Sequence, residues 1–272
     1  MIAWKGWMGK VLALWIAIGS ALPAVPRWPA PRSISVMGAS SVLAYVKAGA
    51  RLWQRAHPGY QVVVSGGGSV AGLIELGRGH VNVAMSDIAP RAEWAAGVVG
   101  FPLGKLPILF VVNRRAGVDA VGANVLADIL RGRIGNWAQV GGQAMPVVVV
   151  GRPLASGARL AVERQVLGGR GSFSRFALMQ LSNGAVLRTV ADTPGAIGFV
   201  EGERQLPGVV QLAVGGRSFD RREPNAWPYY AIPTLYVNPG ASPAVLDFVR
   251  YLARRPDRAR YGLVPLPRGQ AS

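Results

Sequence analysis

Residues 33–87 read SISVMGASSVLAYVKAGARLWQRAHPGYQVVVSGGGSVAGLIELGRGHVNVAMSD, and this stretch decides the fold. Short apolar runs suit buried strands, and the segments between them carry apolar residues at a spacing near 3.6, which is typical of helices. The β-α-β-α-β order predicts parallel strands joined by right-handed crossovers. The expected strands are Ile34–Met37, Tyr60–Val64 and Val81–Met85, and the expected helices are Ser41–Ala56 and Val70–Leu76.

The same alternation continues through the rest of the chain and predicts an α/β protein. Leu106–Asn113 is a long apolar run that suits a buried strand, whereas Pro233 marks Pro228–Val237 as an edge or crossing segment. Further strands are expected at Pro146–Val150 and Gly195–Val200, and helices at Val125–Leu130, 157–167, Phe173–Leu181 and Pro243–Arg254.

Composition excludes several classes of protein. The 272 residues are 50% apolar, so a large core can be buried, and a disordered chain is excluded. The absence of cysteine excludes thiol catalysis and disulfides. The formal charge of +17 raises the alternative of binding to nucleic acid or an anionic surface. However, the densest basic run, Arg250–Arg260, is typical of a solvated helix end, so we expect no nucleic-acid partner.

The N-terminus has the pattern of a secretory signal. Lys5 and Lys10 precede the apolar run Val11–Ala24, which ends in small residues. A spanning helix needs about 20 apolar residues, so an uncleaved anchor is the less favoured alternative. We therefore expect residues 1–24 to be a cleaved signal peptide, residues 25–32 to be an irregular leader, and the protein to be periplasmic.

Three loops place serine and glycine at the start of an expected helix: Gly38–Ser41, Ser65–Ser69 and Ala155–Gly157. A helix N-terminus exposes unpaired N–H groups, and the loops of an α/β sheet meet at the carboxyl ends of its strands. Together these loops predict an anion site. The alternative is that each serine only caps its helix.

Two charged residues follow strands at the same edge. Asp87 comes after Val81–Ser86, and Arg152 comes after Pro146–Val150. Arginine can donate two hydrogen bonds to an oxyanion, and an ionised aspartate can only accept. A carboxylate in an anion site therefore suits an anion that carries a proton. The alternative for Asp87 is a helix cap or an ion pair.

At these residues the sequence resembles the phosphate-binding proteins of bacterial phosphate ABC transporters, over roughly residues 33–267. Each fragment is short, but their order and spacing are specific. The fragments are Gly38–Ser41, Gly67–Gly72, Ser86–Asp87, Ile134–Trp137, Val140–Gly142, Arg152, Ser156–Arg159, Gly195–Val200 and Gly262–Leu266.

The resemblance implies a two-lobed periplasmic-binding-protein fold, each lobe a mostly parallel sheet flanked by helices. It implies crossing hinge strands at Leu106–Asn113 and Pro228–Val237, with lobe one at 33–107 plus 231–272 and lobe two at 108–230. It also implies a monomer that passes inorganic phosphate to the permease subunits of an ABC transporter, with no cofactor and no metal. The implied phosphate contacts are Ser41, Val42, Ser69, Asp87, Arg152, Ser156, Gly157 and Ala158.

The chain departs from the family pattern at two positions. Ala158 stands where the family usually has threonine, which removes a hydroxyl donor with a typical net value of about 0.5–1.5 kcal/mol. Leu154 stands at a position that is usually acidic. These departures leave another oxyanion, such as sulfate or molybdate, and a role as a phosphate sensor open as alternatives.

A secreted hydrolase such as a phosphatase is the alternative of another class. His57 and His80 are the only histidines, and neither lies in a catalytic motif. Gly68–Gly72 only superficially resembles a nucleophile elbow around Ser69. Glu201 is a candidate base, but we expect it to face solvent. We therefore expect no enzymatic activity.

Overall fold

A five-stranded sheet has the order β2-β1-β3-β13-β4. β1 pairs in parallel with β2 and β3, whereas β13 runs antiparallel to β3 and β4. The strands are β1 (Arg32–Gly38), β2 (Tyr60–Gly66), β3 (Val83–Ser86), β4 (Val99–Pro102) and β13 (Thr234–Val237).

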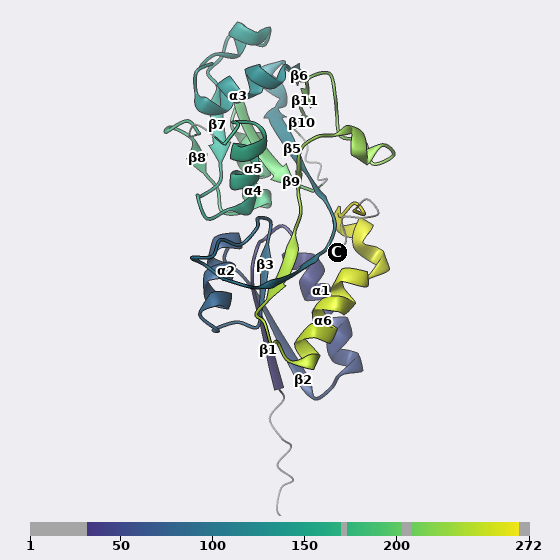
Figure 1. The fold of residues 1–272 in the computed structure, drawn as a ribbon. Helices are drawn as coiled ribbons and strands as arrows, with labels where there is room; N and C mark the ends of the chain where they lie inside the picture. The colour runs from purple at the N-terminus through teal and green to yellow at the C-terminus, as the bar shows by residue number, and fades with distance from the viewer. Residues whose placement is uncertain (1–31, 170–172, 203–207, 267–272) are drawn as a thin grey trace, which may run out of the picture. The chain divides into compact units, whose positions relative to one another are not determined.

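Helices cover both faces of this first sheet, as Figure 1 shows. α1 (Leu43–Ala56) and α6 (Pro243–Arg254) lie together on one face, and α2 (Ser69–Gly77) lies on the other. Each helix buries the apolar residues that its 3.6-residue period places on one side. Burial of these apolar sides positions each helix on the sheet, and so positions the loops that precede α1 and α2.

The second sheet has the order β10-β5-β9-β7-β8, and β12 pairs with β5 at one end. β7 runs parallel to β8 and β9, and β5 runs antiparallel to β9 and β10. Every residue of β5 is buried, as its continuous apolar run predicts. The strands are β5 (Leu106–Asn113), β7 (Val148–Gly151), β8 (Leu178–Met179), β9 (Ala196–Glu201), β10 (Val209–Gln211) and β12 (Tyr230–Ala231).

Three helices flank the second sheet, and smaller elements complete the chain. The helices are α3 (Ala123–Arg131), α4 (Gly157–Gln165) and α5 (Asn183–Asp192). β6 (Ala120–Val121) and β11 (Ala213–Val214) form a separate parallel pair. Short 3-10 helices are found at Arg114–Ala116, Trp137–Val140, Pro224–Ala226 and Pro256–Tyr261.

These elements come from a computed structural model that describes residues 32–169, 173–202 and 208–266. The expected signal peptide, residues 1–24, and residues 25–31 of the expected leader lie outside the described residues. The last residue of the expected leader, Arg32, is not irregular but begins β1. None of the helices in the described ranges has the length and hydropathy that crossing a bilayer requires.

The α/β class is confirmed, but both sheets are mixed rather than mostly parallel. The antiparallel strands β5 and β13 belong to the two segments that cross between the sheets. Each therefore runs in the opposite direction to its neighbouring strand, β9 for β5 and β3 for β13. Pro233 interrupts the expected strand Pro228–Val237, which divides into β12 and β13. Proline lacks the N–H that a continuous ladder needs.

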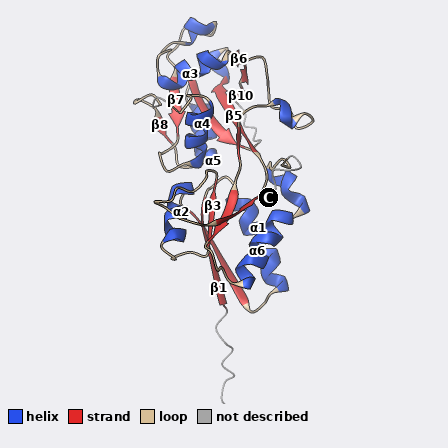
Figure 2. Cartoon of the chain, in the orientation of Figure 1, coloured by secondary structure: helices blue, strands red, loops and turns tan. Residues whose placement is uncertain are grey.

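The helix expected at Phe173–Leu181 is wrong, because this stretch is mostly loop and turn and contains the short strand β8 (Figure 2). Phe176 and Leu181 are exposed, so the apolar residues of the stretch do not share one buried helical face. The helix begins instead at Asn183, after Ser182, whose side chain accepts a hydrogen bond from the N–H of Ala185. The serine cap and the spacing of Val186 and Val190 were the sequence pattern that could have predicted α5.

Candidate functional site

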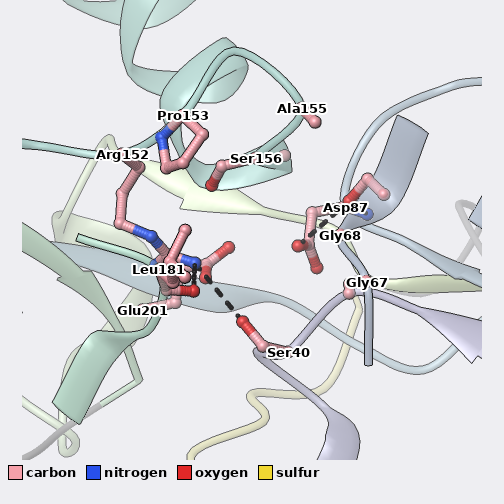
Figure 3. A pocket seen from close by; sticks show the side chains of 13 residues that line it. Ser40, Gly67, Gly68, Asp87, Arg152, Pro153, Ala155, Ser156, Leu181 and Glu201 are labelled. Carbon is pink, nitrogen blue, oxygen red and sulfur yellow. Dashed lines mark hydrogen bonds between the residues drawn. The ribbon is translucent and has the colours of Figure 1, made fainter. Parts of the chain in front are cut away.

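A cavity of about 350 Å³ lies where loops from both sheets meet. Its volume falls in the range of small-molecule sites, which is about 300–1,000 Å³. Figure 3 shows its lining residues as sticks. The first sheet and its helices contribute Ala39, Ser40, Gly67, Gly68, Ser69 and Asp87, and the second contributes Arg152, Pro153, Ala155, Ser156, Gly157, Leu181 and Glu201.

Arg152 is the cation of the cavity and is only 4% exposed. It follows β7, and its guanidinium donates to Oδ1 of Asn183 at 2.9 Å and to the carbonyl of Leu181 at 3.2 Å. It also reaches across to Oγ of Ser40 at 3.3 Å, as Figure 3 shows. Its Nε has no partner among the described residues. The guanidinium is therefore fixed in place by three hydrogen bonds, and its Nε–H is still unused.

Asp87 is the carboxylate contributed by the first sheet and is 5% exposed. It follows β3, and its main-chain N–H donates to Oγ of Ser69 at 3.1 Å. Its carboxylate accepts from Ser41 at 2.7 Å and from Ser69 at 3.4 Å. Burial raises the pKa of Asp87, while these hydroxyls, Glu201 and the charge of Arg152 partly counter that rise.

The three predicted helix starts do converge on this cavity, but their serines have different roles. Ser156 is the N-cap of α4 and accepts from the N–H of Arg159 at 3.5 Å. Gly68 is the N-cap residue of α2, so Ser69 is free to bond Asp87. Val42 is the N-cap residue of α1, and the hydroxyl of Ser41 also bonds Asp87. The capping alternative therefore holds for Ser156 and not for the other two.

Two glycines permit the close approach of backbone that forms the cavity. Gly38 has φ +143°, and a Cβ there would collide with the main-chain oxygen of Met85. Gly157 begins α4, and a Cβ there would lie 2.6 Å from Cβ of Asp87. The start of α4 can therefore meet the residues after β3 only because position 157 has no side chain.

Glu201 is the residue that the sequence analysis misplaced. It ends β9, is 3% exposed and lines the cavity, so the expectation that it faces solvent is wrong. Burial, together with the nearby charge of Asp87, raises the pKa of Glu201 well above its ordinary value. Burial lowers the pKa of Arg152, and the two carboxylates counter that shift. The cavity thus holds one guanidinium and two carboxyl groups.

The predicted site residues are brought together to different degrees. Five of them line the cavity: Ser69, Asp87, Arg152, Ser156 and Gly157. Ser41 is connected to the cavity through its hydrogen bond to Asp87. Val42 and Ala158 are buried and are not among the lining residues. The sequence analysis missed Ser40, although it lies in the quoted loop Gly38–Ser41. The predicted contact in this loop was its neighbour Ser41, which matches the family motif.

The two histidines lie apart from the cavity-lining residues. The ring of His57 stacks on Trp53 and its Nε2 lies 3.7 Å from a carboxylate oxygen of Asp247. The ring of His80 lies 2.8 Å from Glu75. Both are engaged at the surface, as the sequence analysis expected.

The chain is similar in sequence and in fold to known proteins. The chain is 28% identical over 230 residues to the phosphate-binding protein PstS of Bacillus subtilis (strain 168), covering 81% of this chain and 75% of that protein. This match confirms the resemblance to phosphate-binding proteins.

Two solved structures share the fold. A putative phosphate ABC transporter substrate-binding protein with bound phosphate from Clostridium perfringens has a TM-score of 0.79 at 22% identity, covering 87% of this chain and all of that one. An ABC-type phosphate transport receptor from Vibrio cholerae has a TM-score of 0.73 at 23% identity, covering 86% of this chain and all of the receptor. A family model described as a PBP superfamily domain matches residues 25–255. The chain therefore belongs to the PBP superfamily.

Proposed function

We propose that this protein is an exported solute-binding protein that captures inorganic phosphate in the cavity and delivers it to an ABC permease. The observation that carries the proposal is the buried guanidinium of Arg152, a residue that lines the cavity and whose Nε has no partner among the described residues. A fixed guanidinium is suited to an oxyanion, because it donates parallel hydrogen bonds and carries charge.

The helix starts supply the remaining donors. α2 and α4 both begin at residues that line the cavity. All residues of both helices are described, and neither first turn contains an acidic residue. Their N–H groups and the partial positive charge of the helix ends favour an anion. Fixed donors of this kind replace the hydration shell of the ion, and no covalent bond is formed or broken.

Asp87 supports phosphate over other oxyanions. An ionised carboxylate can only accept, so it can pair with a P–OH group. Sulfate and molybdate carry no proton near neutral pH and would meet an unpaired buried carboxylate. The name of the Bacillus subtilis relative and the phosphate bound in the Clostridium perfringens structure support the same choice.

The two crossing segments support a two-lobed mechanism. We assign residues 33–107 plus 231–272 to lobe one and residues 108–230 to lobe two. Leu103 donates to the carbonyl of Pro233, so the segments are held together where they cross. Bending there would open and reclose the cavity, which delivery to a permease requires. We further propose that the exported protein is periplasmic and acts as a monomer.

Titration calorimetry on phosphate-free protein tests the function. We expect one-to-one binding of phosphate and no detectable heat with sulfate or molybdate. Heat with all three ions would favour a general oxyanion binder, and heat with none would contradict the proposal. Release of phosphate from p-nitrophenyl phosphate would instead support the phosphatase alternative.

Gly157→Ala is expected to weaken phosphate binding by about 5- to 150-fold, because overpacking typically costs about 1–3 kcal/mol. The new methyl group would collide with Ser69 and Asp87, which holds the start of α4 away from the ion. Calorimetry with Gly135→Ala provides the matched control, since a Cβ at Gly135 has no atom within 4 Å in the described structure. Equal affinities for the two variants would mean that α4 does not contact phosphate.

A further inference from the structure

Glu201 is a second buried carboxyl in the cavity, contributed by the opposite sheet from Asp87. It ends β9, and its Oε1 is buried without a hydrogen-bond partner among the described residues. Most buried polar atoms are paired, so an orphaned one in a cavity wall indicates a group that is missing from the site. The function proposed above assigns no role to this oxygen.

Glu201 and Asp87 line the same cavity, one from each sheet, and each affects the pKa of the other. Both carboxyls interact with the charge of Arg152, and the side-chain amide of Asn183 donates to the main-chain oxygen of Glu201 at 3.2 Å. Asp87 also lines a second hollow, together with the cations Lys105 and Arg164. Ser41 and Ser69 donate to Asp87.

Two buried carboxyls in the same cavity cannot both ionise easily. Each is desolvated, and each ionised form is repelled by the other. Such pairs titrate as a unit and keep one proton between them to a higher pH than a lone carboxyl does. In agreement with this behaviour, burial and the charge of Asp87 raise the pKa of Glu201, whereas the pKa of Asp87 is raised by burial and lowered by its interaction with Glu201.

We infer that Glu201 is a second proton-reading residue, so that phosphate is held with two protons shared among the ion, Asp87 and Glu201. This inference rests on the phosphate capture proposed above. Each carboxyl then faces one protonated oxygen or holds the proton itself, and the orphaned Oε1 gains its partner. Asp87 alone would account for only one of these protons.

The count of protons gives a direct test with Glu201→Gln. Glutamine has nearly the same shape and removes one negative charge, so the complex reaches the same net charge with one proton fewer. Two measurements yield the count for each protein. Potentiometric titration of the ligand-free protein gives its bound protons, and calorimetry in two buffers of different ionisation heat gives the protons exchanged when phosphate binds.

We expect the phosphate complex of the wild type to hold one more proton than that of Glu201→Gln at about pH 9, well above the second pKa of a phosphate group, which is about 6 for a monoester. A difference of zero would overturn the inference. Glu223→Gln, an exposed carboxylate on the same half of the chain, is the control and should show no difference. If neither protein bound phosphate, the proposed function would fail instead.

The pH dependence of stability separates this role from a merely structural one. A carboxyl whose pKa is raised by folding stabilises the protein fully below its unfolded pKa, and that contribution is lost as pH rises through the folded value. Ligand-free wild type should therefore lose melting temperature relative to Glu201→Gln as the pH rises above the ordinary pKa of a glutamate, about 4.3, toward the raised folded-state value. If Glu201 only held Arg152 in place, the variant would be less stable at every pH, and the inference would be wrong.

Discussion

Arg152→Lys is expected to weaken phosphate binding by about 30-fold or more, because disrupting a buried, hydrogen-bonded charge typically costs about 2–5 kcal/mol. Lysine keeps the charge but loses the planar fork that Asn183 and the carbonyl of Leu181 hold in place. Its single ammonium cannot bond both of these groups and the ion in the same geometry. The weakening should appear in the dissociation constant measured by calorimetry.

Arg133→Lys is the matched control for this prediction. Arg133 is exposed and pairs with Asp128 on the same half of the chain, so its replacement should leave phosphate affinity unchanged. Arg152→Lys binding as tightly as Arg133→Lys would mean that the guanidinium does not contact the ion. Far-ultraviolet circular dichroism would verify that both variants are folded.

Asp87→Asn is expected to reduce the preference for phosphate over sulfate by two orders of magnitude or more. A site that pairs a buried polar group with its ligand can reject an analogue without the matching group by about 10⁴–10⁵. Asparagine offers an N–H₂ donor where aspartate offers only acceptors, so sulfate oxygens no longer meet a buried carboxylate. Phosphate keeps its bonds to Arg152 and the helix starts.

Competition between phosphate and sulfate measures this change in selectivity. Asp192→Asn, at the exposed end of α5, is the control and should keep the wild-type ratio. Unchanged selectivity in Asp87→Asn would remove Asp87 from the recognition of the proton. A loss of phosphate binding without any gain of sulfate binding would assign it a structural role instead.

The sequence predicted the parts of the site that follow from βα units. Asp87 and Arg152 each follow a parallel strand, and such strands place their following loops at one edge of a sheet. Ser69 was found for the same reason, since its loop begins a helix. The prediction of these residues depends on local patterns that can be read from a single sequence.

The remainder depends on contacts between distant segments. Glu201 is buried at the end of β9, where it interacts with Asp87 and Arg152 from distant parts of the chain, and the end of β9 shows no local sign of this. Within the stretch 173–181, β8 pairs with β7 where a helix was expected, and this pairing with a distant strand overrides the helix-like composition. The burial of Val42 and Ala158 likewise depends on how each helix packs on its own sheet.

The position of phosphate in a crystal of the protein grown with the ion tests the central claim most directly. We predict one ion in the cavity, with oxygens about 2.7–3.2 Å from the guanidinium of Arg152 and the first N–H groups of α4, and one oxygen facing Asp87. Phosphate bound elsewhere, or contacting residues of only one sheet, would contradict the claim that both halves of the chain hold the same anion.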